Sequence, residues 1–138
     1  MQPMTPMYRD AEDLRHDVRA VCVRACNLCA EACNACADAC LGEPAVAELV
    51  ICIRTNLDCA DMCATAGEIV DRFRGNHPEL VRAVLEACAV VCDVCADESR
   101  EHADRYVRCA EAVAACETCA DACRAMLAEP ALAEPALR

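Results

Sequence analysis

Cysteines recur along this 138-residue chain at steps of three and four residues. The first six, from Cys22 to Cys40, follow one another at steps of 4, 3, 4, 3 and 4. At about 100° per residue they fall within an arc of roughly 80° on one helix face, and three later sets do the same. The candidate metal ligands are all sixteen: Cys22, Cys26, Cys29, Cys33, Cys36, Cys40, Cys52, Cys59, Cys63, Cys88, Cys92, Cys95, Cys109, Cys116, Cys119 and Cys123.

Three breaks divide the sequence into four helices. Gly42-Glu43-Pro44 and Gly75-Asn76-His77-Pro78 place Gly after one helix and Pro at the start of the next, and Asp104 could cap a fourth helix. We expect helices over about 9–41, 44–74, 78–102 and 104–128, and the triplet Cys-Ala-Asp occurs once in each. Short connections make neighbouring helices antiparallel.

The expected fold class is therefore all-α, an antiparallel four-helix bundle with a Cys-lined core. We expect residues 1–8 to form a loose N-terminal arm or short helix, 9–128 the bundle, and 129–138 a flexible C-terminal tail.

Composition excludes several classes of function. A net charge of −11 without any Lys argues against nucleic-acid binding, and no apolar run approaches the roughly 20 residues of a membrane span. The N-terminal residues contain no apolar signal region, so we expect a cytoplasmic protein with reduced thiols rather than a secreted disulfide scaffold. We see no phosphate-binding loop or catalytic constellation, and we expect no catalytic residues and no enzyme activity.

The thiol pattern favours soft monovalent metal. Cysteines at i and i+4 have Cβ atoms about 5–6 Å apart, within reach of two metal–sulfur bonds of roughly 2.3 Å each. We predict several Cu(I) ions per chain, roughly one per Cys, because bridging thiolates let each sulfur serve two ions. The main alternative is a protein that buffers zinc or a toxic soft metal, followed by an iron–sulfur electron carrier. The alternative without metal is that cysteine serves as a small hydrophobic residue of the core.

The two ends of the predicted bundle differ. One end is predicted to carry an aliphatic plug and the other a polar arc, which we interpret as the place where copper enters. His102 continues the cysteine stripe of its helix and is a candidate imidazole ligand, and the methionines are weaker candidates. The plug residues are Val18, Val70, Val81, Val84 and Leu127; the polar arc holds Cys40, Glu48, His102 and Arg105; the methionines are Met1, Met4, Met7, Met62 and Met126.

A second apolar stripe lies away from the cysteines of the second helix. It consists of Val46, Val50, Ile53 and Leu57. Either it packs against a neighbouring helix within the bundle, or it forms a subunit interface.

Over about residues 15–127 the chain resembles the cytosolic copper storage proteins, a family of Cys-rich four-helix bundles. The resemblance lies in the segments CNLCAEACNACADAC, CDVCADESREH and CAEAVAACETCADAC. It implies a homotetramer, thiolate Cu(I) sites along each bundle, and a role in holding copper for later use or in protection. A copper chaperone or a copper-requiring enzyme is then the expected protein partner. Ser99 and Val113 stand where the pattern would place Cys.

Overall fold

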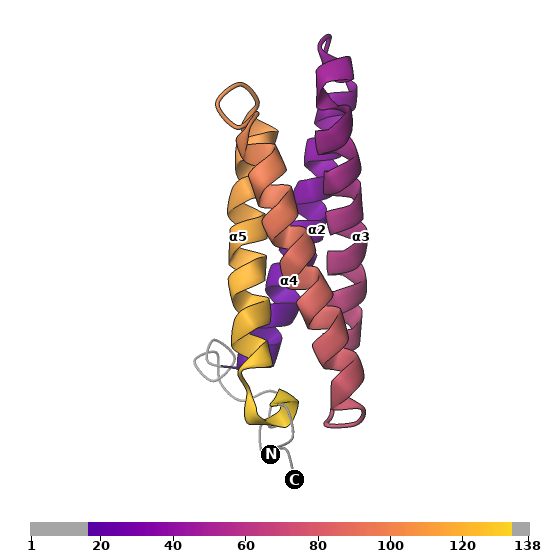
Figure 1. The fold of residues 1–138 in the computed structure, drawn as a ribbon, viewed down its shortest axis with the longest axis vertical. Helices are drawn as coiled ribbons and strands as arrows, with labels where there is room; N and C mark the ends of the chain where they lie inside the picture. The colour runs from indigo at the N-terminus through magenta and orange to yellow at the C-terminus, as the bar shows by residue number, and fades with distance from the viewer. Residues whose placement is uncertain (1–16, 134–138) are drawn as a thin grey trace, which may run out of the picture.

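The computed structural model describes residues 17–133, and four long helices dominate this part of the chain (Figure 1). Two short 3-10 helices accompany them. In chain order the elements are α2 (Val18–Leu41), η1 (Val46–Leu49), α3 (Val50–Arg72), α4 (Pro78–Arg100), α5 (Val107–Leu127) and η2 (Pro130–Leu132).

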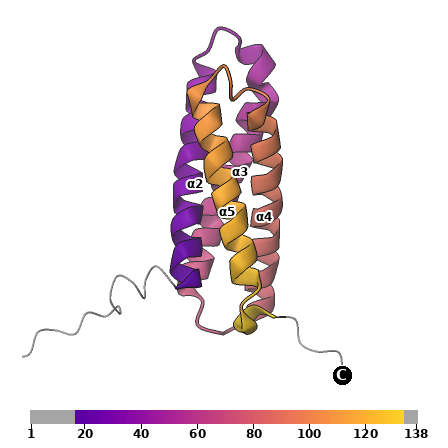
Figure 2. The same ribbon diagram turned by 90° about the vertical axis from the view of Figure 1, so that its left-hand side faces the viewer.

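The long helices form a ring in which each one packs against two others (Figure 2). Helix α2 lies against α3 and α5, and α4 lies against the same two helices. Consecutive helices are joined at alternate ends of the bundle, so neighbours run antiparallel (Figure 1). The predicted fold class, an all-α antiparallel four-helix bundle, is confirmed.

The first helix begins at Val18, because Asp17 caps it. The Asp17 carboxylate accepts hydrogen bonds from the backbone N–H groups of Arg19 and Ala20, at 3.0 and 3.3 Å. Residues 9–16 of the helix expected from residue 9 lie outside the described residues, as does the expected arm over residues 1–8.

The connection between α2 and α3 differs from the prediction. The predicted helix from residue 44 starts instead as a 3-10 helix, η1, and becomes α-helical only at Val50. A 3-10 helix has three residues per turn, so it changes which side chains line up with the stripe that follows. Leu49, three residues before Cys52, is buried, and Glu48 is exposed.

The connection between α3 and α4 has the predicted Gly–Pro form. Gly75 adopts φ +96°, and His77 adopts φ +53°, just before Pro78 opens α4. Positive φ suits Gly because it has no Cβ.

The third connection is longer than predicted. Helix α4 ends at Arg100, and α5 begins at Val107 with Tyr106 at its N-cap. The predicted cap at Asp104 is wrong: backbone bonds such as Tyr106 N–H to the His102 carbonyl, 3.0 Å, hold this segment in successive turns. Asp104 therefore lies within the turns, ahead of the first helical residue.

Part of the predicted tail packs against the bundle. Leu132 in η2 is completely buried, and the Arg82 guanidinium donates a hydrogen bond to the Leu132 carbonyl. The expected flexible tail thus does not describe residues 129–133, and residues 134–138 lie outside the described residues.

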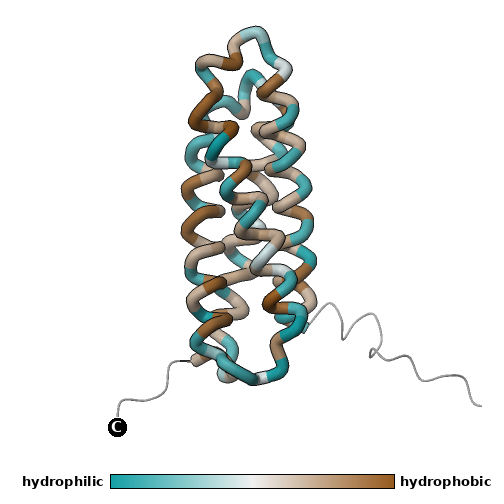
Figure 3. The backbone as a smooth tube through the Cα atoms, turned by 90° about the vertical axis from the view of Figure 1, so that its right-hand side faces the viewer, coloured by the Kyte–Doolittle hydropathy of each residue, from teal (hydrophilic) through white to brown (hydrophobic). Residues whose placement is uncertain are grey.

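Small side chains fill most of the core. Apart from the cysteines, alanines such as Ala37, Ala60 and Ala66 are at most 1% exposed. Helices can approach closely over such residues: a Cβ on Gly67 of α3 would lie 2.9 Å from Asn27 Oδ1 of α2. Hydrophobic and hydrophilic residues alternate along every helix (Figure 3), and within residues 17–133 no helix combines the length and apolarity needed to cross a bilayer.

Candidate metal centre

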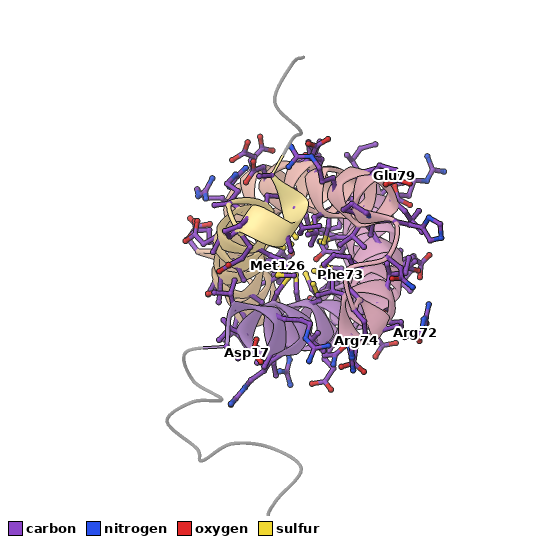
Figure 4. All side chains as sticks on the ribbon, turned by 90° about the horizontal axis from the view of Figure 1, so that it is seen from below. Asp17, Arg72, Phe73, Arg74, Glu79 and Met126 are labelled. Carbon is purple, nitrogen blue, oxygen red and sulfur yellow. The ribbon has the colours of Figure 1, made fainter. Side chains whose placement is uncertain are left out.

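All sixteen thiols point into the bundle. Each is at most 1% exposed and free of any disulfide. The view along the bundle shows sulfur atoms gathered inside the ring of helices (Figure 4). This burial follows from the three- and four-residue spacing, which places one cysteine stripe per helix on the axis.

The sulfurs contact one another both along and between helices. The i, i+4 pairs Cys29–Cys33 and Cys59–Cys63 have Sγ atoms 3.8 Å apart, as the spacing predicts. Cys116 of α5 also lies 3.7 Å from Cys29 and 3.6 Å from Cys33 of α2. Two metal–sulfur bonds of roughly 2.3 Å span up to about 4.6 Å, so both kinds of pair can hold one two-coordinate ion.

Several sets of four sulfurs lie within 4.8 Å of one another. They overlap, since Cys29 and Cys63 each belong to two of them. One thiol can therefore bridge ions in adjacent sets, which suits a chain of soft metal ions. The sets include Cys26/Cys88/Cys119/Cys123, Cys29/Cys33/Cys59/Cys116, Cys29/Cys59/Cys63/Cys92, Cys36/Cys40/Cys52/Cys109 and Cys63/Cys88/Cys92/Cys119.

The buried core separates into two groups of residues, which divide the thiols unequally. The larger group holds the twelve "inner thiols": Cys22, Cys26, Cys29, Cys33, Cys59, Cys63, Cys88, Cys92, Cys95, Cys116, Cys119 and Cys123. The smaller group holds the four "outer thiols": Cys36, Cys40, Cys52 and Cys109.

Two buried polar residues lie between these groups. Asn56 and Ser99 are both 0% exposed. The Asn56 amide donates to the Cys52 carbonyl at 2.9 Å and to Ser99 Oγ at 3.0 Å, while Asn56 Oδ1 has no hydrogen-bond partner. Ser99 Oγ is 3.9 Å from both Cys52 Sγ and Cys95 Sγ, one from each group.

Ser99 was predicted to replace a cysteine, whereas Asn56 was missed. Asn56 sits four residues after Cys52 and three before Cys59, so the spacing alone could have found it. The prediction for Val113 is wrong: Val113 is half-buried, and Ala112 is the residue that is completely buried. The stripe therefore runs from Cys109 to Ala112 in a step of three residues and from Ala112 to Cys116 in a step of four.

The outer thiols differ in their tendency to ionise. Burial raises the pKa of Cys40 and is the largest cause that raises the pKa of Cys109 to about 12. A hydrogen bond with Cys36 lowers the pKa of Cys52 to about 6, and Ser99 and the charge of His102 act in the same direction. Cys52 is thus the outer thiol held most readily as a thiolate, the form that binds metal.

The end of the bundle near the outer thiols, here called the mouth, has a surface cavity beside the buried Cys40. A surface cavity of about 200 Å³ is lined by Cys40, Glu43, Arg105 and Tyr106, among others. His102 lies in the turn after α4 with its side chain 18% exposed, and its Nε2 is 3.8 Å from Glu98 Oε1. The mouth therefore keeps the predicted His102 and Cys40.

Two other residues predicted for the polar arc do not face the interior of the bundle. Glu48 is exposed, because η1 turns Leu49 inward in its place. Arg105 is also exposed, with its guanidinium 5.5 Å from the centre of the Tyr106 ring.

The opposite end of the bundle is closed by larger apolar side chains. Val70 and Val81 are buried as predicted, and Val18, Val84 and Leu127 are half-buried against the core. The plug also includes Leu85, Phe73, Met126 and Leu132, and Figure 4 shows Phe73 and Met126 near the centre of the ring. Leu85 could have been predicted, since it continues the stripe between Val81 and Cys88.

Two of the candidate methionines lie within the described part of the chain. Met126 is buried in the plug, and Met62 is half-buried beside the inner thiols. Met1, Met4 and Met7 lie outside the described residues.

The second apolar stripe divides between two environments. Ile53 is 7% exposed and packs with the outer thiols, which agrees with packing inside the bundle. Val50 and Leu57 remain 39% and 41% exposed.

A bundle built around so many buried, mutually contacting thiols is a thiolate metal-binding protein, and comparison with known proteins identifies which kind. A sequence model of Csp, the copper storage protein family, matches residues 15–128. The chain belongs to the copper storage protein family, as the sequence resemblance predicted. The uncharacterized cysteine-rich protein YhjQ of Bacillus subtilis is 36% identical over 107 residues, covering 78% of this chain and 87% of the relative.

Solved structures confirm both the fold and the link to copper. A cytosolic copper storage protein from Streptomyces lividans with five coppers is 44% identical, covering 85% of this chain and 98% of its own, with a TM-score of 0.80. Ccsp from the same organism, loaded with 10 copper equivalents, is 43% identical over 91% and 93% of the two chains, with a TM-score of 0.80. Cu(I)-bound BsCsp3 is 33% identical over 81% and 100%, with a TM-score of 0.72.

Proposed function

We propose that this protein stores Cu(I) on the thiolates inside its bundle, at roughly one copper per Cys. The single observation that carries the proposal is the continuous contact among buried sulfurs, with Sγ–Sγ distances of 3.6–3.9 Å among the inner thiols. Each Cu(I) needs only two or three sulfurs, so a thiol that contacts several others can bridge neighbouring ions. The copper-loaded relatives support this assignment.

The geometry favours Cu(I) over the alternative metals. Zinc takes four ligands in closed tetrahedral sites, and overlapping sets that share Cys29 and Cys63 cannot all be occupied in that way. An iron–sulfur carrier uses closely spaced cysteines on irregular backbone, whereas these sixteen thiols all lie on helices. Monovalent copper also replaces one thiol proton with one positive charge, so a dry interior gains no uncompensated charge.

All sixteen cysteines and His102 are the proposed ligands. His102 is the candidate at the mouth, because it lies close enough to influence Cys52 and retains contact with solvent. Its imidazole could accept Cu(I) before the thiols do. The cavity that reaches Cys40 lies at the same end, whereas the plug closes the other.

We further propose a homo-oligomer, a tetramer by family resemblance. Helices α3 and α4 expose several large apolar side chains: Val50, Ile51, Leu57, Val90 and Val94 are 39–62% exposed. A groove of about 600 Å³ between these helices is lined in part by Val90, Val91 and Val94. Burial of this face against other copies would remove apolar surface from water.

The proposed setting is the cytoplasm, where thiols stay reduced. The copper storage protein from Streptomyces lividans is a cytosolic protein. In that setting a copper chaperone would deliver the copper, or a copper-requiring enzyme would receive it. We assign the chain no enzyme activity, because the proposed role of every thiol is to hold copper and not to bind a substrate.

An anaerobic Cu(I) titration tests the proposal. The reduced full chain is titrated in the presence of a coloured Cu(I) chelator, and a parallel titration uses Zn(II). We expect the protein to withhold roughly 16 Cu(I) from the chelator, one per Cys. Saturation at about four ions, with Zn(II) bound as tightly, would instead indicate tetrahedral zinc sites. Metal analysis of the protein from copper-grown and zinc-grown cells gives the corresponding result in vivo.

A further inference from the structure

The sulfur stripe of α5 continues beyond its last cysteine. Cys116, Cys119, Cys123 and Met126 follow one another at steps of 3, 4 and 3, so Met126 occupies the position that the spacing would give to a further cysteine. Its side chain is 4% exposed and packs in the same core group as the inner thiols. Figure 4 shows Met126 near the centre of the ring of helices. A thioether therefore lies inside the bundle, one stripe step beyond the last thiol of α5.

The other three helices supply hydrocarbon at the corresponding position. One stripe step beyond the thiols, toward the plug, α2 has Val18, α3 has Ala66 and α4 has Leu85. Ala66 and Leu85 are completely buried, and Val18 is half-buried against the core. Of the four stripes, the one on α5 thus ends in a sulfur atom that could bind a soft metal ion.

The thiol at this end of the core has few sulfur neighbours. Cys22 is the first thiol of α2, and hydrogen bonds with Cys123 and Cys26 raise the pKa of its thiol. Cys123 interacts with Cys119 and Cys88 in addition to these two thiols. A copper ion held by Cys22 therefore meets further thiols on the inner side, and toward the plug it meets the side chains described above.

Met126 can reach an ion held between Cys22 and Cys123. Long side chains on a helix point back over the residues three and four positions earlier, so Met126 extends toward Cys123. Their Cβ atoms are about 5–6 Å apart, a gap that two metal–sulfur bonds of roughly 2.3 Å each can close. Met126 also lines a surface cavity of about 390 Å³ with Val18 and Phe73, so its flexible side chain has room to adjust.

We propose that Met126 is a copper ligand whose thioether completes the coordination of the Cu(I) held by Cys22 and Cys123 at the plugged end. This inference rests on the proposed Cu(I) storage and adds one ligand to it. Thioethers, like thiolates, are soft ligands that select Cu(I). Because a thioether is neutral, it adds a bond to the ion without adding negative charge to a dry interior.

The binding step involves no change of redox state. As Cu(I) bonds to the sulfurs of Cys22 and Cys123, each thiol that becomes a ligand releases its proton. Met126 donates a lone pair and exchanges neither a proton nor an electron. The ion at the plugged end thus has a third ligand without a third thiolate.

X-ray absorption at selenium tests this assignment directly. The full chain is produced with selenomethionine, reduced and loaded anaerobically with Cu(I), and its copper content is measured first. We expect a copper neighbour at roughly 2.3–2.5 Å from selenium, close to the length of a metal–sulfur bond. The chain contains five methionines, so this neighbour should be found at one selenium atom in five if Met126 is the ligand.

Met126→Leu is the decisive variant, since leucine fills a similar volume without a sulfur atom. We expect it to remove the copper neighbour of selenium. In chelator competition it should hold one ion about tenfold less tightly, a loss comparable to that of other groups that support a metal site. Met62→Leu is the matched control: Met62 is half-buried beside the inner thiols, and the selenium signal should persist in this variant.

A fully loaded chain with no copper neighbour at selenium would overturn the assignment. So would a copper neighbour that persists unchanged in Met126→Leu, or one that is lost in Met62→Leu and kept in Met126→Leu. Circular dichroism of the apo variants verifies that both are folded. If storage itself were wrong, the copper content after loading would show it first, because the chain would retain little Cu(I) before any absorption is measured.

Discussion

Truncating Leu85 to Ala should greatly lower the free energy of unfolding of the metal-free bundle. Cysteine and alanine fill most of the core, so large apolar side chains are concentrated at its ends. Leu85 is 0% exposed in the plug, where Val70, Val81 and Phe73 are also buried. Removing such a side chain typically costs about 2–5 kcal/mol, from lost burial and the cavity that remains.

That cost is a large share of a total stability of about 5–15 kcal/mol. With a urea dependence of about 2 kcal/mol per M, the unfolding midpoint of the reduced apo-protein should fall by roughly 1–2.5 M. Circular dichroism in a urea series measures the shift. The matched control is Leu80→Ala on the same helix, because Leu80 is 53% exposed and its truncation should change stability by only about 0.5 kcal/mol or less.

The copper-loaded forms of both variants should stay folded to much higher urea concentrations. Every ion that binds only the folded chain adds to its stability, and many ions together outweigh one lost side chain. Equal midpoints for the two apo variants would refute the reasoning. Stability would then reside in the packing of the thiols, and the plug would contribute little.

Three further predictions concern copper itself. The reduced apo-protein should stay helical by circular dichroism, since Ala-rich helices have high propensity and reduced Cys packs as a small hydrophobe; a random-coil spectrum would contradict this. His102→Phe should slow copper loading in stopped-flow transfer and reduce the capacity by at most an ion or two. Normal loading in this variant, together with faster uptake in Leu127→Ala, would instead show that copper enters at the plugged end. Copper should be held less tightly at about pH 6.5 than at about pH 8 in chelator competition, because burial raises the pKa of Cys40 and Cys109 and each Cu(I)–thiolate bond displaces a proton; a pH-independent affinity would mean that these thiols are already ionised.

Periodicity predicted the bundle well because it fixes which residues face the axis. A cysteine stripe with steps of three and four can be buried only in a helix, and four stripes with short connections leave few arrangements. The same arithmetic placed Val70 and Val81 in the plug. The same spacing also places Asn56, Leu85 and Ala112 on the inward stripes, although these residues are not cysteines.

The errors fall where local backbone geometry departs from the α-helix. Glu48 was placed inward by assuming a helix from residue 44, whereas the 3-10 turn of η1 buries Leu49. Asp104 looked like a cap by residue type, but the backbone stays in turns up to Tyr106. Contacts between helices, such as Cys33 with Cys116, depend on the stagger of the helices, which no single helix encodes.

Loading copper changes the charge of this protein very little. Each Cu(I) that displaces one proton from a thiol leaves the formal net charge of −11 unchanged, so loading adds charge only at a thiol that is already ionised, as Cys52 is at neutral pH. The long-range field around the bundle is then nearly the same for full and empty copies, so a partner drawn to the acidic surface approaches both alike. Discrimination between them must come from direct contact at the mouth, where the proposed ligands Cys40 and His102 would hold the outermost copper.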